Sequence, residues 1–401
     1  MMPVDEAIAR IIRKLPSLGS EIVGLGAANG RVLAKPLTSS HNQPPFDSSA
    51  MDGYAVRAAE VAPGKALKLA GTAQAGARFI GMMQPGQCVR IFTGAPMPIG
   101  ADAVIMQEEA TANGNQIGFA KAVRPGQNLR KQGFDFRRGA ELLPPGTALT
   151  PQMLSLAAGA NQPTMTVTKR PRIAILATGD ELVPPGTPLG PDQIVASNSF
   201  GLSALLAPYA ESIIDLGIVP DDKPKLDAKL LEAFDAGIDI LITTGGASVG
   251  DRDYVQEVLK DLGVDVDFWK LRMRPGKPLM FGTRGKTLVF GLPGNPVSAH
   301  VTATVILKPV LRALLGHPDP LWPRIGVPTL AALPPNGPRR HYMRGNLSRN
   351  DIGFLQVMPI FETDSGHSSS LAMADALIVQ PEDHPGAPPG EIVEVIPLNW
   401  G

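Results

Sequence analysis

The sequence predicts a multidomain protein in which a doubly wound α/β domain lies between two β-rich parts. Between residues 171 and 318, five short apolar runs alternate with segments of helical periodicity. This alternation is typical of a parallel sheet covered by helices on both faces. Residues 43–136 and 319–401 instead carry short apolar segments between glycine and proline turns. These segments favour an inserted β-rich domain and a C-terminal β-barrel or sandwich.

Composition restricts the classes of function. The 401 residues are 44% hydrophobic, and Lys+Arg and Asp+Glu each number 37, so the net charge is zero. We therefore expect no nucleic-acid partner and no membrane partner. The N-terminal residues have no signal-peptide core, and no uncharged apolar run reaches about 18 residues. Cys88 is the single cysteine, which excludes an internal disulfide and is compatible with a cytoplasmic location.

We expect four domains along the chain. The first is discontinuous, begins with an amphipathic helix and includes a helical stretch at 151–160. The α/β domain ends with a helix at 296–315, and a Gly-His-Pro-Asp-Pro linker follows it. The predicted boundaries are 1–42 with 137–168, 43–136, 169–318 and 319–401.

Polar loops follow each of the five apolar runs of the α/β domain. The runs are 173–177, 213–219, 238–242, 264–269 and 287–290, and the loops begin at 178, 220, 243, 270 and 291. Ligands of open α/β sheets bind at the carboxyl ends of the strands. Five such loops at one edge predict a binding site there. Gly285-Lys286-Thr287, in contrast, is predicted to be a hairpin turn, because a P-loop would need an earlier glycine.

The third loop, 243–250, is a glycine-rich elbow that precedes a helix expected to begin near Tyr254. Backbone N–H groups at such an elbow suit phosphate or another oxyanion. Asp251 and Asp253 follow the elbow. They are either carboxylates beside a divalent metal or acidic residues that favour the first turn of a helix. Both interpretations remain open on this segment alone.

The loops carry charges of both signs. Glu181, Asp221 and Asp253 can supply oxygen ligands for Mg²⁺. Arg274 and Lys277 can hold an oxyanion, and the Pro-Gly turn between them can direct both at one point. The set suits a phosphate-bearing or nucleotide-bearing substrate, a metal and a second anion. Asp222 and Arg272 are more simply explained as solvated loop residues.

Two further loops lie outside the α/β domain. Residues 44–55 combine turn formers with Phe, Met and Tyr, which indicates a packed functional loop with Asp52 as its polar tip. Residues 365–370 form a row of serines that suits a tetrahedral oxyanion, although a flexible serine loop would have the same composition. We expect His367 to be a hydrogen-bonding loop residue.

The motifs and their order resemble the MoeA-type molybdopterin molybdenumtransferases, which include the E domain of gephyrin and the plant molybdenum-insertase proteins. The resemblance extends over essentially the whole chain. It rests on PFDSSAMDGYA at 45–55, FTGAP at 92–96, TGDEL at 178–182, TGGASVG at 244–250, PGKP at 275–278 and GLPGNPVS at 291–298.

The resemblance implies a homodimer of elongated four-domain subunits with a molybdopterin-binding type of α/β domain. It also implies the final step of molybdenum cofactor biosynthesis. In that step molybdate enters the dithiolene of adenylylated molybdopterin, and AMP leaves in a Mg²⁺-dependent reaction. Transient contacts with the upstream adenylyltransferase, and with molybdoenzymes or their chaperones, would follow.

The resemblance also assigns site residues. Catalytic positions are Asp52, Thr93, Glu181, Asp221 and Asp253, of which the last three would bind Mg²⁺. Binding positions are Thr178, Gly245, Gly246, Ser248, Gly250, Lys270, Arg274, Lys277, Pro293, Gly294, Asn295, Arg344, Ser369 and Ser370. Arg274 stands where many members carry Lys, which keeps the charge but replaces a point donor by a planar fork.

Three alternatives remain. The adenylyltransferase that precedes this step shares the α/β fold but lacks the flanking β domains. A scaffold of the gephyrin kind would not need the acidic and basic loops. A relative that prefers tungstate would have the same motifs.

Overall fold

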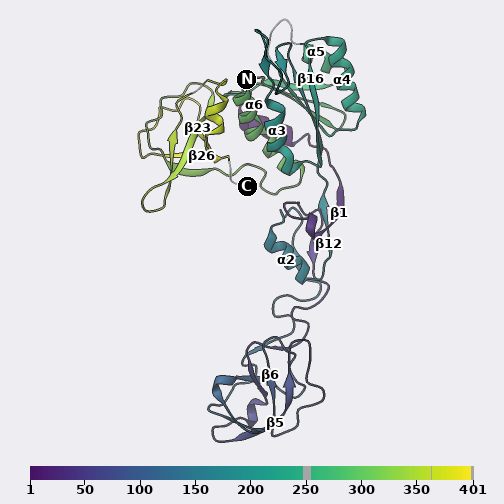
Figure 1. Cartoon of the computed structure of the whole chain (residues 1–401), viewed down its shortest axis with the longest axis vertical. Coiled ribbons are helices and arrows are strands. Elements are labelled where there is room, and N and C mark those ends of the chain that lie inside the picture. The colour runs from purple at the N-terminus through teal and green to yellow at the C-terminus, as the bar shows by residue number, and fades with distance from the viewer. Residues whose placement is uncertain (247–253, 363, 399–401) are drawn as a thin grey trace. The chain divides into compact units, whose positions relative to one another are not determined.

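The computed structural model describes residues 1–246, 254–362 and 364–398, and Figure 1 labels some of its helices and strands. The chain forms two compact units. One consists of Met1–Glu21 with Thr168–Gly401, and the other is Ile22–Val167. The predicted α/β domain and the predicted C-terminal β domain both belong to the first unit. The four predicted domain boundaries remain predictions.

A six-stranded sheet forms the centre of the α/β domain. Its order is β16 (Ser212–Val219), β13 (Arg172–Thr178), β17 (Ile240–Thr244), β21 (Thr287–Leu292), β20 (Pro278–Arg284) and β18 (Asp265–Lys270). The first four strands are parallel, whereas β20 is antiparallel to both of its neighbours. The expectation of a wholly parallel sheet is therefore wrong at β20. The hairpin turn predicted at 285–287 joins β20 to β21, and β18 still runs in the same direction as β21.

Helices cover both faces of this sheet because successive residues of the buried strands point to opposite sides. Ile173 and Ile175 pack in one core, and Ala174 and Leu176 pack in the other. The first core holds α3 (Asn198–Leu206), α6 (Pro296–Thr302), α7 (Lys308–Leu314) and α1 (Val4–Ile12), and the second holds α4 (Lys223–Asp235) and α5 (Tyr254–Asp261).

The span Pro296–Leu314, which includes α6 and α7, is a continuous helix with one π-helical segment, Ala303–Leu307. By length and composition it could cross a membrane, but 83% of its most apolar window is buried inside the protein. Burial of this kind is typical of a core helix.

The first helix, α1, packs on the α/β domain. Its apolar stripe, which includes Val4, Ile8 and Ile11, is buried in the first core. Met2 also forms a parallel bridge with Leu271, next to the end of β18. Residues 1–21 cluster with residues 168–401 in the first unit. An amphipathic pattern identifies the face that is buried but not the surface that buries it.

The C-terminal strands form a barrel. The order is β19 (Met273–Arg274), β23 (Arg340–Arg349), β25 (Ala376–Gln380), β26 (Ile392–Pro397) and β22 (Ile325–Pro328), and β24 (Leu355–Pro359) pairs with β23. The ring closes where Thr329 pairs with Val357 just after β22, and the Leu330 amide donates to the Val357 carbonyl at 2.8 Å. One short helix, α8 (Ser368–Ala372), interrupts the strands.

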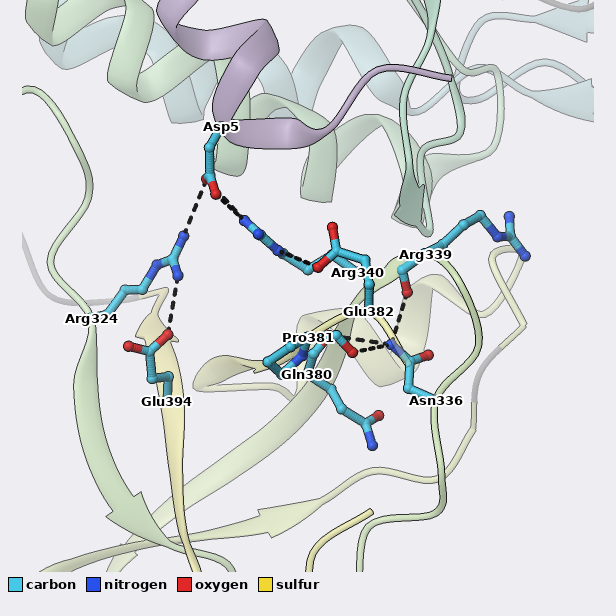
Figure 2. A network of polar contacts seen from close by, with 9 residues as sticks. All are labelled: Asp5, Arg324, Asn336, Arg339, Arg340, Gln380, Pro381, Glu382 and Glu394. Atoms are coloured by element: carbon cyan, nitrogen blue, oxygen red, sulfur yellow. Dashed lines mark hydrogen bonds and ion pairs between the residues drawn. The ribbon is translucent and has the colours of Figure 1, made fainter. Parts of the chain in front are cut away.

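A polar network joins α1 to the barrel (Figure 2). Arg340 donates to both carboxylate oxygens of Asp5 at 2.9 Å, and its Nε lies 3.4 Å from Glu382. Arg324 lies 3.1 Å from Glu394 and 3.9 Å from Asp5. The N-terminal helix therefore contacts both the α/β sheet and the barrel.

The second unit contains its own six-stranded sheet, with the order β7-β4-β6-β5-β9-β8. Cys88 is buried in its core with Leu67 and Ile105. A second, smaller core surrounds α2 (Pro151–Gly159). The strands of the sheet are β4 (Gly53–Val56), β5 (Ala66–Ala73), β6 (Gln87–Ile91), β7 (Ala103–Met106), β8 (Ala110–Asn113) and β9 (Gln116–Phe119). The remaining short pairs are β1 (Ser20–Gly24) with β12 (Thr164–Thr168), β2 (Leu37–Thr38) with β11 (Glu141–Leu143), and β3 (Ser48–Ser49) with β10 (Leu129–Arg130).

Candidate functional site

A cavity of about 400 Å³ opens at the carboxyl ends of β13, β17 and β21. Two short strands, β14 (Leu182–Val183) and β15 (Ile194–Val195), and the first turn of α3 complete its wall. Seven residues that were predicted for the site line this cavity: Thr178, Glu181, Gly245, Gly246, Pro293, Gly294 and Asn295. The structure thus gathers the predicted loops of three strands around one space.

Glycine is required where two of these loops meet. Gly245 has φ +90°, and a Cβ atom added there would lie 2.4 Å from the carbonyl oxygen of Thr178. A Cβ atom on Gly294 would lie 3.6 Å from Cα of Gly245. The loops therefore approach each other backbone to backbone, and Gly245, Gly246 and Gly294 contribute no side chain to the cavity lining.

Two buried polar atoms of residues that line this cavity have no hydrogen-bond partner among the described residues. They are Oγ1 of Thr178 and Oδ1 of Asn198. The Asn198 amide nitrogen donates to the Gly294 carbonyl at 2.7 Å, which fixes the side chain at the wall. Unsatisfied polar atoms at a cavity indicate a ligand or water. Asn198 was not predicted, although the Ser-Asn-Ser triplet at 197–199 could have indicated it.

The acidic residues come from neighbouring loops. Glu181 lines the cavity, and Asp221 follows β16 with its backbone amide donating to Oδ1 of Asp180 at 3.0 Å. Asp222 caps α4 by accepting from the Lys225 amide at 3.0 Å, so it has a structural role. Within the described residues, no three His, Cys, Asp or Glu side chains form a metal-binding group. Asp253, Ser248 and Gly250 lie outside the described residues, so the metal site remains a prediction.

The basic loop begins where β18 ends at Lys270. Gly276 has φ +95°, and a Cβ atom there would lie 2.3 Å from Oγ1 of Thr302, so the turn packs against α6. The Leu271 amide donates to the Lys277 carbonyl at 2.9 Å, and Met273 and Arg274 pair with β23. The side chains of Arg274 and Lys277 are exposed. The loop thus holds two cations on a fixed backbone.

Arg344 is buried and bound to the loop that precedes α8. Its guanidinium donates to the carbonyls of Glu362, Asp364 and His367, the last two at 3.3 and 3.2 Å. It also donates to Oγ of Ser370 at 2.7 Å. Burial lowers the pKa of Arg344. The structure brings Arg344 and Ser370 together, but four acceptors within the protein already occupy the guanidinium.

The serine row is the start of a short helix and not a flexible loop. Ser369 and Ser370 lie in α8, and the side chain of Ser369 is exposed. Just before this helix, Oγ of Ser365 accepts from the Asn295 amide nitrogen at 2.9 Å. Nδ1 of His367 lies 3.5 Å from Oε2 of Glu362, which is consistent with a loop residue in polar contact. The hydrogen bond between Asn295 and Ser365 therefore places the serine row beside the α/β cavity.

His341 lies near both sets of basic residues. It pairs in register with Arg274 between β19 and β23. Burial, reinforced by the charges of Arg274 and Arg344, lowers the pKa of His341 to about 4. The ring is therefore neutral near pH 7 and does not add to the positive charge of this region.

Asp52 and Thr93 form a pair in the second unit. Oδ1 of Asp52 accepts from the Thr93 amide at 2.7 Å and from its hydroxyl at 2.8 Å. These hydrogen bonds lower the pKa of Asp52. Phe46 and Gly94, on either side of this pair in the sequence, line a cavity of about 560 Å³ with Arg130 and Phe134. The predicted loop is therefore packed, with an ionised carboxylate at its tip.

Family comparisons cover almost the whole chain. Residues 2–160 match the MoeA N-terminal region (domain I and II), residues 174–313 match a "Probable molybdopterin binding domain", and residues 327–398 match the MoeA C-terminal region (domain IV). A molybdopterin molybdenumtransferase from Haemophilus influenzae is 35% identical over 404 residues, which is 100% of this chain and 99% of that protein. The chain belongs to the MoeA family.

Other MoeA relatives agree in length and fold. A molybdopterin molybdenumtransferase from Nostoc sp. is 38% identical over 95% of this chain and 90% of its own length. A solved molybdopterin biosynthesis MoeA protein from Pyrococcus horikoshii OT3 superposes with a TM-score of 0.85 at 28% identity, covering 99% of this chain and 100% of that one. The predicted family and the predicted combination of α/β and β domains are confirmed.

Proposed function

We propose that this MoeA protein inserts molybdenum from molybdate into the dithiolene of adenylylated molybdopterin and releases AMP. Its relatives are named molybdopterin molybdenumtransferases, and the class of enzyme, a transferase of molybdenum cofactor biosynthesis, follows from them. One observation supports the specific reaction best. A cavity lined by three glycines and the carboxylate of Glu181 lies at the same sheet edge as a fixed loop with two exposed cations.

The cavity residues suit the substrate. Gly245, Gly246 and Gly294 line the cavity without side chains, so a phosphate in it could approach peptide groups closely. Oγ1 of Thr178 and Oδ1 of Asn198, which have no partner among the described residues, offer polar contacts. Glu181 and Asp221 supply oxygen donors of the kind that Mg²⁺ prefers. When bound, Mg²⁺ would supply charge neutralisation at the phosphate.

Molybdate is a tetrahedral dianion, and Arg274 and Lys277 supply two positive charges on the fixed loop. Charge-assisted hydrogen bonds from two such cations are strong and directional. Arg344 uses four of its five N–H donors on protein acceptors. We therefore propose that Arg344 mainly orders the segment at 364–370, while Arg274, Lys277 and Ser369 face the oxyanion.

The decisive test is a turnover assay with purified protein, adenylylated molybdopterin and Mg²⁺. We expect AMP release that depends on added molybdate. An adenylyltransferase would instead consume ATP with unmodified molybdopterin, and a scaffold would catalyse neither reaction. Replacing molybdate by tungstate in the same assay measures which oxyanion is preferred. AMP release that does not depend on either oxyanion would contradict the proposal.

A further inference from the structure

Arg90 lies beside the predicted Asp52 loop in the six-stranded sheet of the second unit. Strand β4 begins at Gly53, immediately after Asp52, and its neighbours β6 and β7 both run antiparallel to it. The start of β4 therefore lies beside the ends of β6 and β7, and Arg90 pairs in register with Tyr54. Arg90 is not among the residues predicted for the site.

Two hydrogen bonds tie Asp52 to this edge of the sheet. The Gln107 amide, just after β7, donates to the Asp52 carbonyl at 3.1 Å. The Thr93 amide, just after β6, donates to the Asp52 carboxylate at 2.7 Å. A Cβ atom on Gly53 would lie 1.8 Å from the Ile105 carbonyl oxygen, so β4 can lie this close to β7 only with glycine at its start.

The guanidinium of Arg90 contacts residues on both sides of this arrangement. Nη1 donates to the Gly53 carbonyl at 2.8 Å, and Nη2 donates to Oε1 of Gln107. Cζ lies 5.2 Å from the centre of the Tyr54 ring and 4.7 Å from the centre of the Phe92 ring. Two directed donors and two aromatic contacts favour one orientation of a planar group, which a lysine ammonium cannot reproduce.

Arg90 also affects the charge at the tip of the loop. The hydrogen bonds from Thr93 make the largest contribution to the lowered pKa of Asp52, and the positive charge of Arg90 lowers it as well. Arg90 therefore binds the peptide after Asp52, binds the residue that holds the Asp52 carbonyl, and favours the carboxylate that Thr93 binds. All three effects act on Asp52.

We propose that Arg90 is a positioning residue for the transfer of molybdenum, because it fixes the backbone next to Asp52 and so determines where the carboxylate lies. Arg90 acts through Asp52 and does not contact the substrate. This inference rests on the proposed function for the reaction and for the catalytic role of Asp52. The positioning of the loop rests only on the contacts of Arg90.

Amide hydrogen exchange of the full-length protein tests the positioning without turnover. Arg90→Met keeps an apolar stem but removes the guanidinium. The Thr93 and Gln107 amides should then exchange roughly five- to thirtyfold faster, the loss expected for one or two hydrogen bonds. Arg90→Lys keeps the charge and loses the planar fork, so its exchange rates should lie between those of Arg90→Met and of the unchanged protein.

Arg57→Met is the matched control. Arg57 also donates to a backbone carbonyl of the same unit, that of Met83, and it pairs with Glu60 at 3.1 Å. None of these contacts involves Asp52, so the Thr93 and Gln107 amides should exchange in Arg57→Met as they do in the unchanged protein.

The turnover assay separates positioning from substrate binding. Arg90→Met should lower kcat for AMP release by roughly ten- to hundredfold, because a displaced catalytic group loses its alignment. The KM for adenylylated molybdopterin and the molybdate requirement should stay unchanged, and Arg90→Lys should recover part of the rate. A raised KM with an unchanged kcat would show that Arg90 binds the substrate, which would overturn the positioning role.

The two proposals fail separately. Unchanged exchange of the Thr93 and Gln107 amides in Arg90→Met would overturn the positioning role, whatever the turnover assay shows. Faster exchange with an unchanged kcat would also overturn it, because the contact would then be structural only. Faster exchange in a protein without molybdate-dependent AMP release would support the positioning of Asp52 and contradict the proposed reaction. Thermal unfolding checks that each variant folds, and Arg90→Lys serves as the test if Arg90→Met does not fold.

Discussion

Among single residues, Lys277 tests the proposed oxyanion site most directly. Lys277→Ala should raise the molybdate concentration needed for half-maximal AMP release by roughly 30- to 1000-fold, because one charged contact contributes about 2–4 kcal/mol. Lys286→Ala is the matched control, since Lys286 is exposed in the turn between β20 and β21. Weaker binding of the pterin substrate with an unchanged molybdate requirement would show that the loop binds a different anion.

The burial of Lys308 predicts that the free energy of unfolding depends on pH. It is 5% exposed, and its ammonium lies 3.4 Å from the centre of the Trp322 ring. Burial, with a smaller contribution from Arg312, lowers the pKa of Lys308 from 10.5 to about 8. Between these values the unfolded chain binds a proton that the folded protein does not, so stability from this residue rises with pH across that window.

Lys308→Met should remove this rise. The free energy of unfolding of the unchanged protein, relative to that of the variant, should increase between pH 8 and 10 by up to about 3 kcal/mol. Urea unfolding at several pH values measures the difference. Lys260→Met, at an exposed position of α5, should leave the pH dependence as it is. A constant difference between Lys308→Met and the unchanged protein would mean that Lys308 keeps an ordinary pKa.

At the scale of secondary-structure elements, the attachment of α1 depends on Asp267 in β18. Its side chain is 1% exposed and pairs with Arg10 and with Lys14, the latter at 2.8 Å. Burial alone would raise the pKa of Asp267, but hydrogen bonds from Arg10 and Lys14 outweigh it and lower the pKa below 3.8. The contribution to stability is therefore present at neutral pH and is lost only as the pH falls below about 4.

Asp267→Ala should lower the free energy of unfolding by about 1–2 kcal/mol at pH 7, because both partners are partly exposed. It should also make the N-terminal residues more sensitive to limited proteolysis. Asp261→Ala serves as the comparison, since Asp261 pairs with Lys223 at 2.9 Å on the surface. Equal losses in both variants at pH 7 would argue against a special role for the buried carboxylate.

Most elements of the α/β domain were predictable because apolar runs mark buried strands. The strand β20 was not predicted, because it begins at a proline and contains Gly282. It also follows a loop whose charged residues indicate a binding segment and draw attention away from the strand. The position of Asn198 depends on the pairing of Leu182 with Ile194, a short contact between turn-rich segments that no local pattern encodes. The charge of Arg344 was predictable, but its carbonyl partners depend on how the segment at 364–370 folds.

At the scale of the whole molecule, the resemblance implies a homodimer. The long separation in sequence between the Asp52 loop and the α/β site predicts that each active site takes residues from both subunits. Asp52 and Asp221 belong to different compact units, so each can be changed without altering the other. Asp52→Ala and Asp221→Ala should each abolish AMP release. Mixed dimers should regain up to half of the activity per dimer, because one of the two sites would then be intact.

The mixing experiment needs subunits that exchange, which a brief denaturation and refolding step provides. Sedimentation should show a dimer for each variant and for the mixture. Activity in the mixture that never exceeds that of either parent would contradict a site shared between subunits. A monomer in sedimentation would contradict the predicted assembly itself.

The short strand β19 has a consequence for observing the reaction. Met273 and Arg274 belong to the proposed oxyanion loop, yet their backbone partners lie in β23 of the barrel, where the Arg340 amide donates to the Arg272 carbonyl at 3.0 Å. An anion that restrains this loop also restrains those interstrand bonds. Amide hydrogen exchange at residues 340–342 should therefore slow as molybdate binds. The exchange rate of these barrel amides would then measure the fraction of oxyanion sites that hold molybdate.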